Sequence, residues 1–309
     1  MNQPGRGKNT SLAHLNLRYP ALPQTFLRIM ELMEQDASSD AGAVSDAIVH
    51  DPGAVGRILR LANSGRQRPE DEIRTVHKAV EVLGPETVAG VILSMNMSEI
   101  RSTLDITTTL PFLNFVRHSV ATAFLARYLY LMNPEAPRDA AARLERANEA
   151  FTAGLMHDFG KLLLLYNFPE EASRFYGAMA HEFRTDYAIL EAERVLFGFS
   201  HVEAGSFLAR QMHFPAQLTQ AMALHHTYAD LGTMPRALRQ LVYVVSAANR
   251  AAHAMEEESD DSDLERCFQD DIWRLLLADG ALSVDSLQDL LGEFVELKPS
   301  LEEYLGAFA

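Results

Sequence analysis

The feature that most constrains the fold of this chain is the helical spacing of its apolar residues. Residues 53–63 place Val55, Ile58, Leu59 and Ala62 on one stripe, which is the pattern of an amphipathic helix packed against a core. The same spacing recurs along nearly the whole chain, and no segment alternates apolar and polar residues as a half-buried strand does. The sequence therefore predicts an all-α protein.

Prolines, glycines and small polar residues mark where the predicted helices begin and end. Asp51-Pro52 is typical of a helix start, and Asn63-Ser64-Gly65 is typical of a helix end. The apolar spacing between such signals predicts helices over residues 21–35, 53–63, 76–83, 88–95, 114–132, 138–152, 152–166, 170–183, 187–197, 201–212, 215–227, 236–254, 272–277 and 283–297.

The charge and composition of the chain exclude several classes of protein. Its 309 residues carry a formal net charge of −15, and such a surface repels phosphate backbones and anionic membranes. No apolar run approaches the roughly 18 residues of a membrane-spanning helix. The single cysteine, Cys267, excludes an intrachain disulfide and fits a reducing compartment. We therefore expect a cytoplasmic protein that binds neither nucleic acid nor membrane.

A histidine and an aspartate stand side by side at His157-Asp158, inside the largely apolar segment AGLMHDFGKLLLLY. A carboxylate close to a core needs a partner, because an unpaired buried charge is costly. Imidazole and carboxylate groups together suit a divalent ion such as Zn, Fe, Mn or Ni. The histidines whose sequence contexts make them candidates for the same shell are His118, His201, His225 and His226.

Two neighbouring residues add to this hypothesis. Lys161, one helical turn after the His-Asp pair, offers a positive charge to a phosphate oxygen. Gly205, one turn after His201, has no side chain to keep another helix at a distance. The cluster also fits a structural interpretation, in which a buried hydrogen-bond network holds the helices in register. The residues alone leave both interpretations open.

The chain resembles the HDOD (HD-related output domain) family of bacterial signalling proteins over roughly residues 20–255. The resemblance rests on motifs in both halves, which are HDPGAVGRILRLANS at 50–64, IRTVHKAVEVLGPETVAGVIL at 73–93, AGLMHDFGKLLL at 153–164 and SHVEAGSFLARQMHFPAQLTQAMALHH at 200–226. HDOD proteins are similar to HD-domain metal-dependent phosphohydrolases, which include cyclic-dinucleotide phosphodiesterases of the HD-GYP type. The HDOD family itself is generally regarded as non-catalytic.

The resemblance implies a set of metal ligands and also a departure from it. In the HD superfamily a first histidine, the His-Asp doublet and a distant aspartate bind metal, and further histidines join in HD-GYP enzymes. The matching positions are His118, His157, Asp158, His201, His225 and His226, whereas the distant aspartate is replaced by Asn249. An amide is a weaker ligand than a carboxylate. Thr227 also stands where HD-GYP enzymes have a glutamate, and the Gly-Tyr-Pro signature is missing.

The resemblance also implies a domain organisation. We expect a flexible tail over residues 1–14 and an N-terminal helical bundle over 15–110. This bundle should pack on an HD-like helical bundle over 111–255 that carries the histidine site. Residues 256–309 begin with an acidic run and should form a linker and a short C-terminal helical appendage.

Three functions remain as alternatives at this point. The first is a non-catalytic signal-transduction output or scaffold module that acts through a protein partner, and Asn249 and the missing loop signature favour it. The second is a metal-dependent phosphohydrolase acting on a nucleotide or cyclic dinucleotide, with Lys161 on the phosphate. The third is a metal- or nucleotide-binding switch without turnover, in which a ligand changes the packing of the helices.

Overall fold

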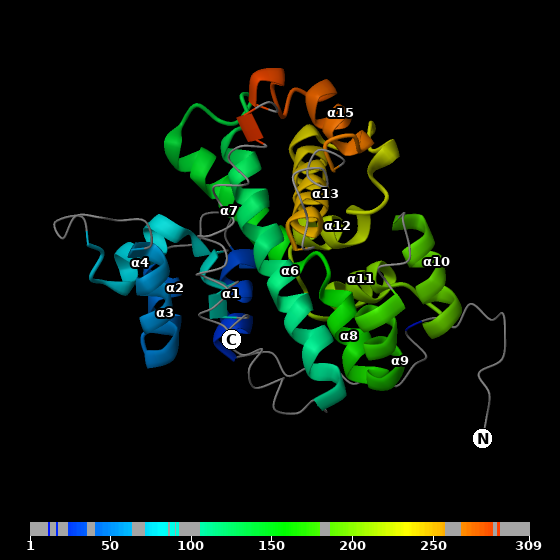
Figure 1. Cartoon of the computed structure of the whole chain (residues 1–309). Helices are drawn as coiled ribbons and strands as arrows, with labels where there is room; N and C mark the ends of the chain where they lie inside the picture. Colours follow the sequence, from blue (N-terminus) through cyan, green and yellow to red (C-terminus); the bar gives the residue numbers. More distant parts are fainter. Residues whose placement is uncertain are drawn as a thin grey trace.

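The structure is a computed structural model of the chain. It describes residues 24–35, 41–63, 72–85, 87–89, 91–92, 106–179, 186–256, 267–286 and 289–290, together with Leu12 and Leu17. Every regular element within these residues is a helix (Figure 1). The prediction of an all-α fold is thus confirmed. Among the residues described, no helix combines the length and the apolarity that a membrane crossing requires.

The N-terminal helices form a group of their own, seen in blue and cyan at one side of the molecule in Figure 1. They are α1 (Gln24–Gln35), α2 (Ala41–Ile48), α3 (Pro52–Asn63) and α4 (Val76–Leu83). Their apolar stripes face inward, so that Phe26, Ile29, Val44, Ile58 and Val80 are fully buried. The helical positions at 87–89 and 91–92 belong to the predicted helix over 88–95, whose other residues lie outside the described ones.

A long central helix, α6 (Ile106–Leu131), carries the second half of the fold. It packs along α7 (Ala140–Met156) and α13 (Arg236–Glu256). The sequence predicted that this helix begins at residue 114. That start is wrong, since the helix continues through Pro111, which is buried together with Phe112.

Shorter helices surround the central ones, and they are α8 (Phe159–Asn167), α9 (Pro169–Arg174), the π-helix η3 (Phe175–Met179), α10 (Asp186–Phe197), α11 (His201–Gln211), α12 (Ala216–Leu224), the 3₁₀ helix η5 (Tyr228–Asp230) and α15 (Asp271–Ala278). One predicted boundary in this region is wrong. The helix expected over 152–166 is broken, because α7 ends at Met156 and α8 begins at Phe159. The His157-Asp158 pair therefore lies at the junction of two helices.

The core is continuous through both predicted subdomains. One cluster of buried residues runs from Phe26 in α1 to Trp273 in α15. Across the boundary, the ring of Phe26 meets that of Phe214 edge to face, with centroids 6.1 Å apart. A smaller cluster lies around Leu164, and Leu12 and Leu17 pack against it. The only described residue of the predicted flexible tail, Leu12, is therefore packed against the second half of the fold.

The described C-terminal residues pack on the second half of the fold. Helix α15 contacts α13, and its buried Trp273 joins the main core. Polar contacts hold it from both sides, since Tyr228 donates a hydrogen bond to Asp270 at 2.9 Å and Arg239 Nε donates one to Asp279 at 2.7 Å. Most of the helix predicted over 283–297 lies outside the described residues.

Glycines bring α8 and α11 into backbone contact. A Cβ atom added to Gly160 would lie 1.8 Å from the carbonyl oxygen of His201 and 2.6 Å from the amide nitrogen of Gly205. Only glycine fits at such a distance. The close approach predicted from Gly205 is confirmed. It places His157-Asp158, which precede α8, against the first turn of α11.

This contact gives a stability prediction. Gly160→Ala should lower the free energy of unfolding by about 3 kcal/mol or more, because backbone atoms cannot move aside as a flexible side chain does. Gly56→Ala in α3 is the matched control, since its Cβ would meet only Arg60 Nη1, at 3.8 Å. The control should gain about 0.5–1 kcal/mol from helix propensity. Urea denaturation measures both, and equal effects would contradict the close contact.

Candidate metal centre

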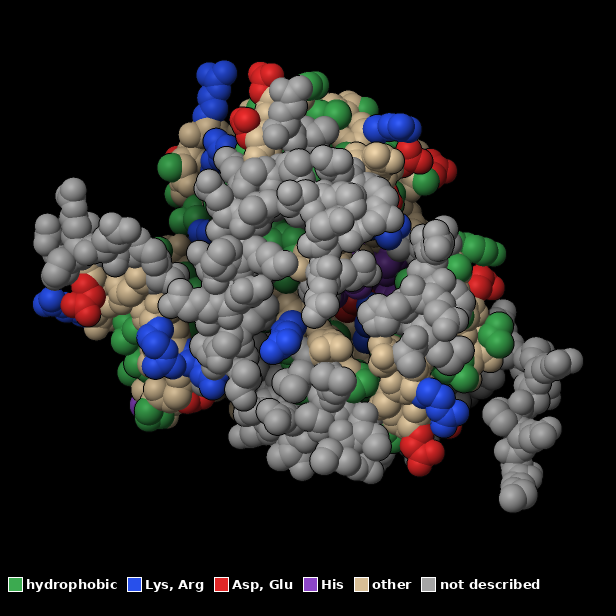
Figure 2. Space-filling view, in the orientation of Figure 1, with side chains coloured by type: hydrophobic (Ala, Val, Ile, Leu, Met, Phe, Trp, Pro, Cys, Tyr) green, Lys and Arg blue, Asp and Glu red, His purple; other side chains and the backbone are tan. Residues whose placement is uncertain are grey.

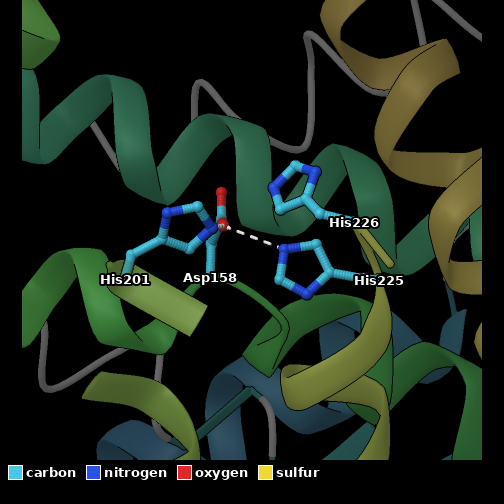
Figure 3. Close-up of side chains that lie close together, drawn as sticks. All are labelled: Asp158, His201, His225 and His226. Atoms are coloured by element: carbon cyan, nitrogen blue, oxygen red, sulfur yellow. Dashed lines mark ion pairs between the residues drawn. The ribbon is translucent and has the colours of Figure 1, made fainter. Parts of the chain in front are cut away.

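The carboxylate of Asp158 lies at the centre of the predicted cluster. Asp158 follows the end of α7 and is 1 % exposed. The histidines reach it from separate elements. His118 comes from the middle of α6, His201 is the first residue of α11, and His225 and His226 follow the end of α12. Figure 3 shows Asp158 with His201 on one side and His225 and His226 on the other. The structure thus brings together all the predicted site residues.

One oxygen of Asp158 faces the histidines of α11 and of the α12 terminus. Asp158 Oδ1 lies 3.2 Å from His201 Nε2 and 3.5 Å from His225 Nε2. Within the part of the chain that the structure describes, none of these three buried atoms has a hydrogen-bond partner. With His226 they form a group whose candidate ligand atoms all lie within 4.8 Å of one another. We call this group the Oδ1 group.

The other oxygen of Asp158 faces α6 and the doublet itself. Asp158 Oδ2 lies 3.3 Å from His157 Nε2 and 3.6 Å from His118 Nε2. These three residues form the second group that can hold an ion, which we call the Oδ2 group. Its surroundings differ from those of the Oδ1 group, because Lys161 Nζ lies 2.5 Å from Oδ2 and Asn249 Oδ1 lies 2.9 Å from His118 Nε2.

The ends of two helices fix the orientation of the histidine rings. The last carbonyls of a helix lack partners within the helix and accept hydrogen bonds from nearby groups. His157 follows α7, and its Nδ1 lies 2.7 Å from the Gly154 carbonyl; His225 follows α12, and its Nδ1 lies 3.1 Å from the Met222 carbonyl. Each Nδ1–H donates to its carbonyl, so that each Nε2 turns a lone pair toward Asp158.

His201 is oriented in the same way by a buried glutamate. Its Nδ1 lies 2.7 Å from Glu193 Oε2, and its backbone N–H donates to the same oxygen at 2.7 Å. Glu193 is fully buried and also accepts a hydrogen bond from the Tyr176 hydroxyl at 2.8 Å. A carboxylate behind a histidine is a common arrangement in metal sites, where it fixes the tautomer and raises the basicity of the ligand.

Sequence reasoning did not single out Glu193. The signal was present, because Leu190, Glu193 and Phe197 fall on one face of α10 at helical spacing, and an acid on an apolar face is unusual. His253 was also left unassigned, and its ring stacks on that of His118 with centroids 4.1 Å apart. By contrast, His77 lies on the surface 3.2 Å from Glu81, away from the cluster.

The pKa values in the cluster follow from these contacts. Burial would raise the pKa of Asp158, but the adjacent His157 and Lys161 hold it well below its usual value. Burial lowers the pKa of His225 to about 4, so its ring is neutral. Burial opposes the charged form of His201 as well, yet Glu193 and Asp158 raise the pKa of His201 to about 9. The space between the two carboxylates therefore favours a positive charge.

The residues fit a divalent ion. Imidazole lone pairs and a carboxylate oxygen that face one another repel unless a cation or a proton lies between them. An ionised carboxylate and oriented imidazoles also bind metal, and a divalent ion would take the place of the proton that the two carboxylates favour on His201. Figure 2 shows histidine side chains in a hollow of one face, with acidic and basic side chains next to them.

Comparison with known proteins gives one family and several structures. The HDOD domain model matches residues 19–228. No curated protein matches. A candidate phosphohydrolase from Shewanella amazonensis is 22 % identical, with a TM-score of 0.64 over 94 % of this chain and 95 % of that one. An HDOD domain protein of unknown function from Geobacter sulfurreducens is 21 % identical, with a TM-score of 0.66 over 94 % and 92 %.

A third structure is that of a protein from Marinobacter aquaeolei named for signal transduction. It is 19 % identical, with a TM-score of 0.65 over 95 % of this chain and 62 % of that longer protein. At such low identities these likenesses establish the fold, and the HD-like arrangement of the second half agrees with the predicted one.

The buried carboxylate of Glu193 gives a second prediction. Glu193→Ala should lower the free energy of unfolding by about 3–5 kcal/mol, because it leaves the groups that now donate to a buried charge without their acceptor. Glu191→Ala removes a partly exposed carboxylate from the same helix, where it pairs with Arg194, and should cost less than about 1 kcal/mol. Chemical denaturation of both variants checks the difference, which would vanish if Glu193 were an ordinary surface acid.

Proposed function

The chain belongs to the HDOD family, and from this premise we propose that it is a non-catalytic signalling module that binds a divalent metal ion at Asp158 and acts through a protein partner. One observation carries the metal-binding part. Asp158 Oδ1, His201 Nε2 and His225 Nε2 face one another without hydrogen-bond partners among the described residues. A native core rarely leaves three such groups together unless a ligand satisfies them.

The positions around Asp158 Oδ2 support the absence of turnover. A bound divalent ion supplies Lewis acidity, which polarises a phosphoryl oxygen and lowers the pKa of a water molecule. Hydrolytic HD sites add a further carboxylate, which this chain replaces with Asn249. Here Asn249 Oδ1 accepts from His118, and Lys161 is held by Asp158. The further groups at the Oδ2 side are therefore an amide and an ammonium, neither of which takes a proton from a water.

The placement of the ligands supports a signalling role. The Oδ1 group joins the junction of α7 and α8, the start of α11 and the end of α12. An ion held by all three favours the helix packing in which they converge, and so shifts the population of that packing. A protein surface that forms only in this helix packing can then bind a partner only when the helices are packed in that way. The name of the Marinobacter protein, signal transduction, agrees with this role.

The second candidate is a metal-dependent phosphohydrolase that acts on a nucleotide or cyclic dinucleotide. The observation that favours it is the position of Asp158, whose two oxygens face two groups of histidines as a bridging ligand would. The name of the Shewanella protein points the same way. In this alternative Lys161 leaves Asp158 and contacts the phosphate.

Metal binding is tested directly by adding Mn²⁺ to metal-stripped protein and measuring the bound ion. We expect stoichiometric binding, with a gain in unfolding free energy of about 2.7 kcal/mol when the ion is a hundredfold above its Kd. Asp158→Ala and His225→Gln should abolish both effects, because they remove facing ligand atoms. His77→Ala is the control, since His77 lies outside the cluster.

Two results would contradict metal binding. One is wild-type protein that retains no ion and shows no shift in melting temperature. The other is loss of binding in the His77 variant to the same degree as in the His225 variant. Circular dichroism on each variant verifies that the helices are intact.

Lack of turnover is tested with Mn²⁺-loaded protein and two substrates, a chromogenic phosphodiester and cyclic diguanylate. We expect no hydrolysis above that of Mn²⁺ alone, because the further acidic ligand is missing. Hydrolysis that disappears in Asp158→Ala and persists in His77→Ala would overturn the proposal in favour of the phosphohydrolase.

A further inference from the structure

We infer that Lys161 is a built-in cation that takes the place of a second metal ion at Asp158, so that the cluster binds one divalent ion, in the Oδ1 group. This inference rests on the metal binding proposed above. It assigns the two groups around Asp158 different roles, although both contain histidines and both share the same carboxylate.

The Oδ2 group already holds positive charge and protons supplied by the chain. Lys161 Nζ donates to Asp158 Oδ2 at 2.5 Å, and the side chain of Lys161 is 16 % exposed. A lysine three residues after an aspartate reaches it across one helical turn. The ammonium also lies 5.9 Å from the centre of the Tyr176 ring, where the face of the aromatic ring attracts a cation.

His118 does not offer a lone pair to this group. Its Nε2 lies 2.9 Å from the amide oxygen of Asn249, which only accepts, so the nitrogen carries the proton and donates it. The same N–H points toward His157 Nε2 at 3.3 Å, whose lone pair accepts because its Nδ1–H is bound to Gly154. The candidate ligand atoms of the Oδ2 group therefore satisfy one another.

The Oδ1 group shows the opposite pattern. Its Asp158 oxygen and the Nε2 atoms of His201 and His225 face one another, and none of these three atoms has a hydrogen-bond partner within the described residues. Glu193 accepts a hydrogen bond from His201 Nδ1, so that Nε2 is the ring atom that faces Asp158. An ion placed in this group takes the place of one proton, on His201, whereas an ion in the Oδ2 group must displace an ammonium as well as a proton.

The charge balance leads to the same assignment. The cluster contains the carboxylates of Asp158 and Glu193, both buried. One divalent ion together with Lys161 exceeds them by about one positive charge, whereas two ions with Lys161 exceed them by about three. Uncompensated charge in a buried site is strongly unfavourable. Removing the ammonium lowers this excess and exposes Asp158 Oδ2, so that a second ion can bind.

The test compares Lys161→Met with Lys161→Arg in the full chain, titrated with Mn²⁺ by calorimetry and equilibrium dialysis. We expect about one equivalent for the wild type and about two for Lys161→Met, the second binding more weakly. Lys161→Arg keeps the cation and should bind about one equivalent. Electron paramagnetic resonance adds an independent readout, since an isolated Mn²⁺ and a pair bridged by Asp158 give uncoupled and exchange-coupled spectra.

A second pair of variants locates the single ion. His225→Gln should weaken the binding of the first Mn²⁺ at least tenfold, because it removes a facing ligand. His118→Gln alters only the Oδ2 group and should leave the first binding step within about twofold of the wild type. If His118→Gln weakened the first binding step more than His225→Gln, the ion would lie in the Oδ2 group, which would overturn the inference.

The outcomes separate this inference from the proposed function. A wild type that binds no Mn²⁺ would end the metal-binding proposal itself. A wild type that binds a coupled pair would overturn only the role of Lys161. So would a Lys161→Met variant that still binds one equivalent while Asn249→Asp takes up a second, because the amide and not the ammonium would then limit the site.

Discussion

The site depends on one buried charge, the carboxylate of Asp158, which no solvent stabilises. Such a group persists only where the protein surrounds it with donors or cations, and this chain does so from several helices at once. Lys161 comes from α8, His201 from α11 and His225 from the end of α12. The glycine contact between α8 and α11 makes this convergence geometrically possible. Packing and electrostatics therefore impose the same arrangement on the second half of the fold.

Much of this arrangement follows from the sequence, because helical spacing and the His-Asp doublet are local signals. The all-helical fold, the approach at Gly205 and the placement of Asn249 beside His118 agree with the structure. What the sequence did not predict depends on contacts between distant segments. The break after Met156 falls between Gly154 and Gly160 but has no proline or glycine at the break itself, and the role of Glu193 is visible only when α10 lies beside His201. Orientation by helix-end carbonyls is likewise visible only in three dimensions.

The difference between a binding module and an enzyme rests on a few residues around the same cluster of histidines. Glu193 and the carbonyls at two helix ends accept hydrogen bonds from the Nδ1 atoms of the histidines, and so orient their rings as metal ligands are oriented. An amide, that of Asn249, and an ammonium, that of Lys161, contact the cluster directly. The residues that orient the candidate ligands also stabilise the fold, so that their arrangement is compatible with a binding module as well as with an enzyme. The same reasoning explains why overall similarity in fold carries no statement about activity.

Helix α12 connects the cluster to the N-terminal bundle. His225 follows its last residue, while Phe214 precedes its start and meets the ring of Phe26 in α1. Its nine residues span roughly 13 Å along the helix axis. Helix α12 is therefore flanked at one end by the buried cluster at His225 and at the other by the aromatic contact of Phe214 with α1. The same short helix thus ties the placement of a candidate ligand to the packing between the two groups of helices.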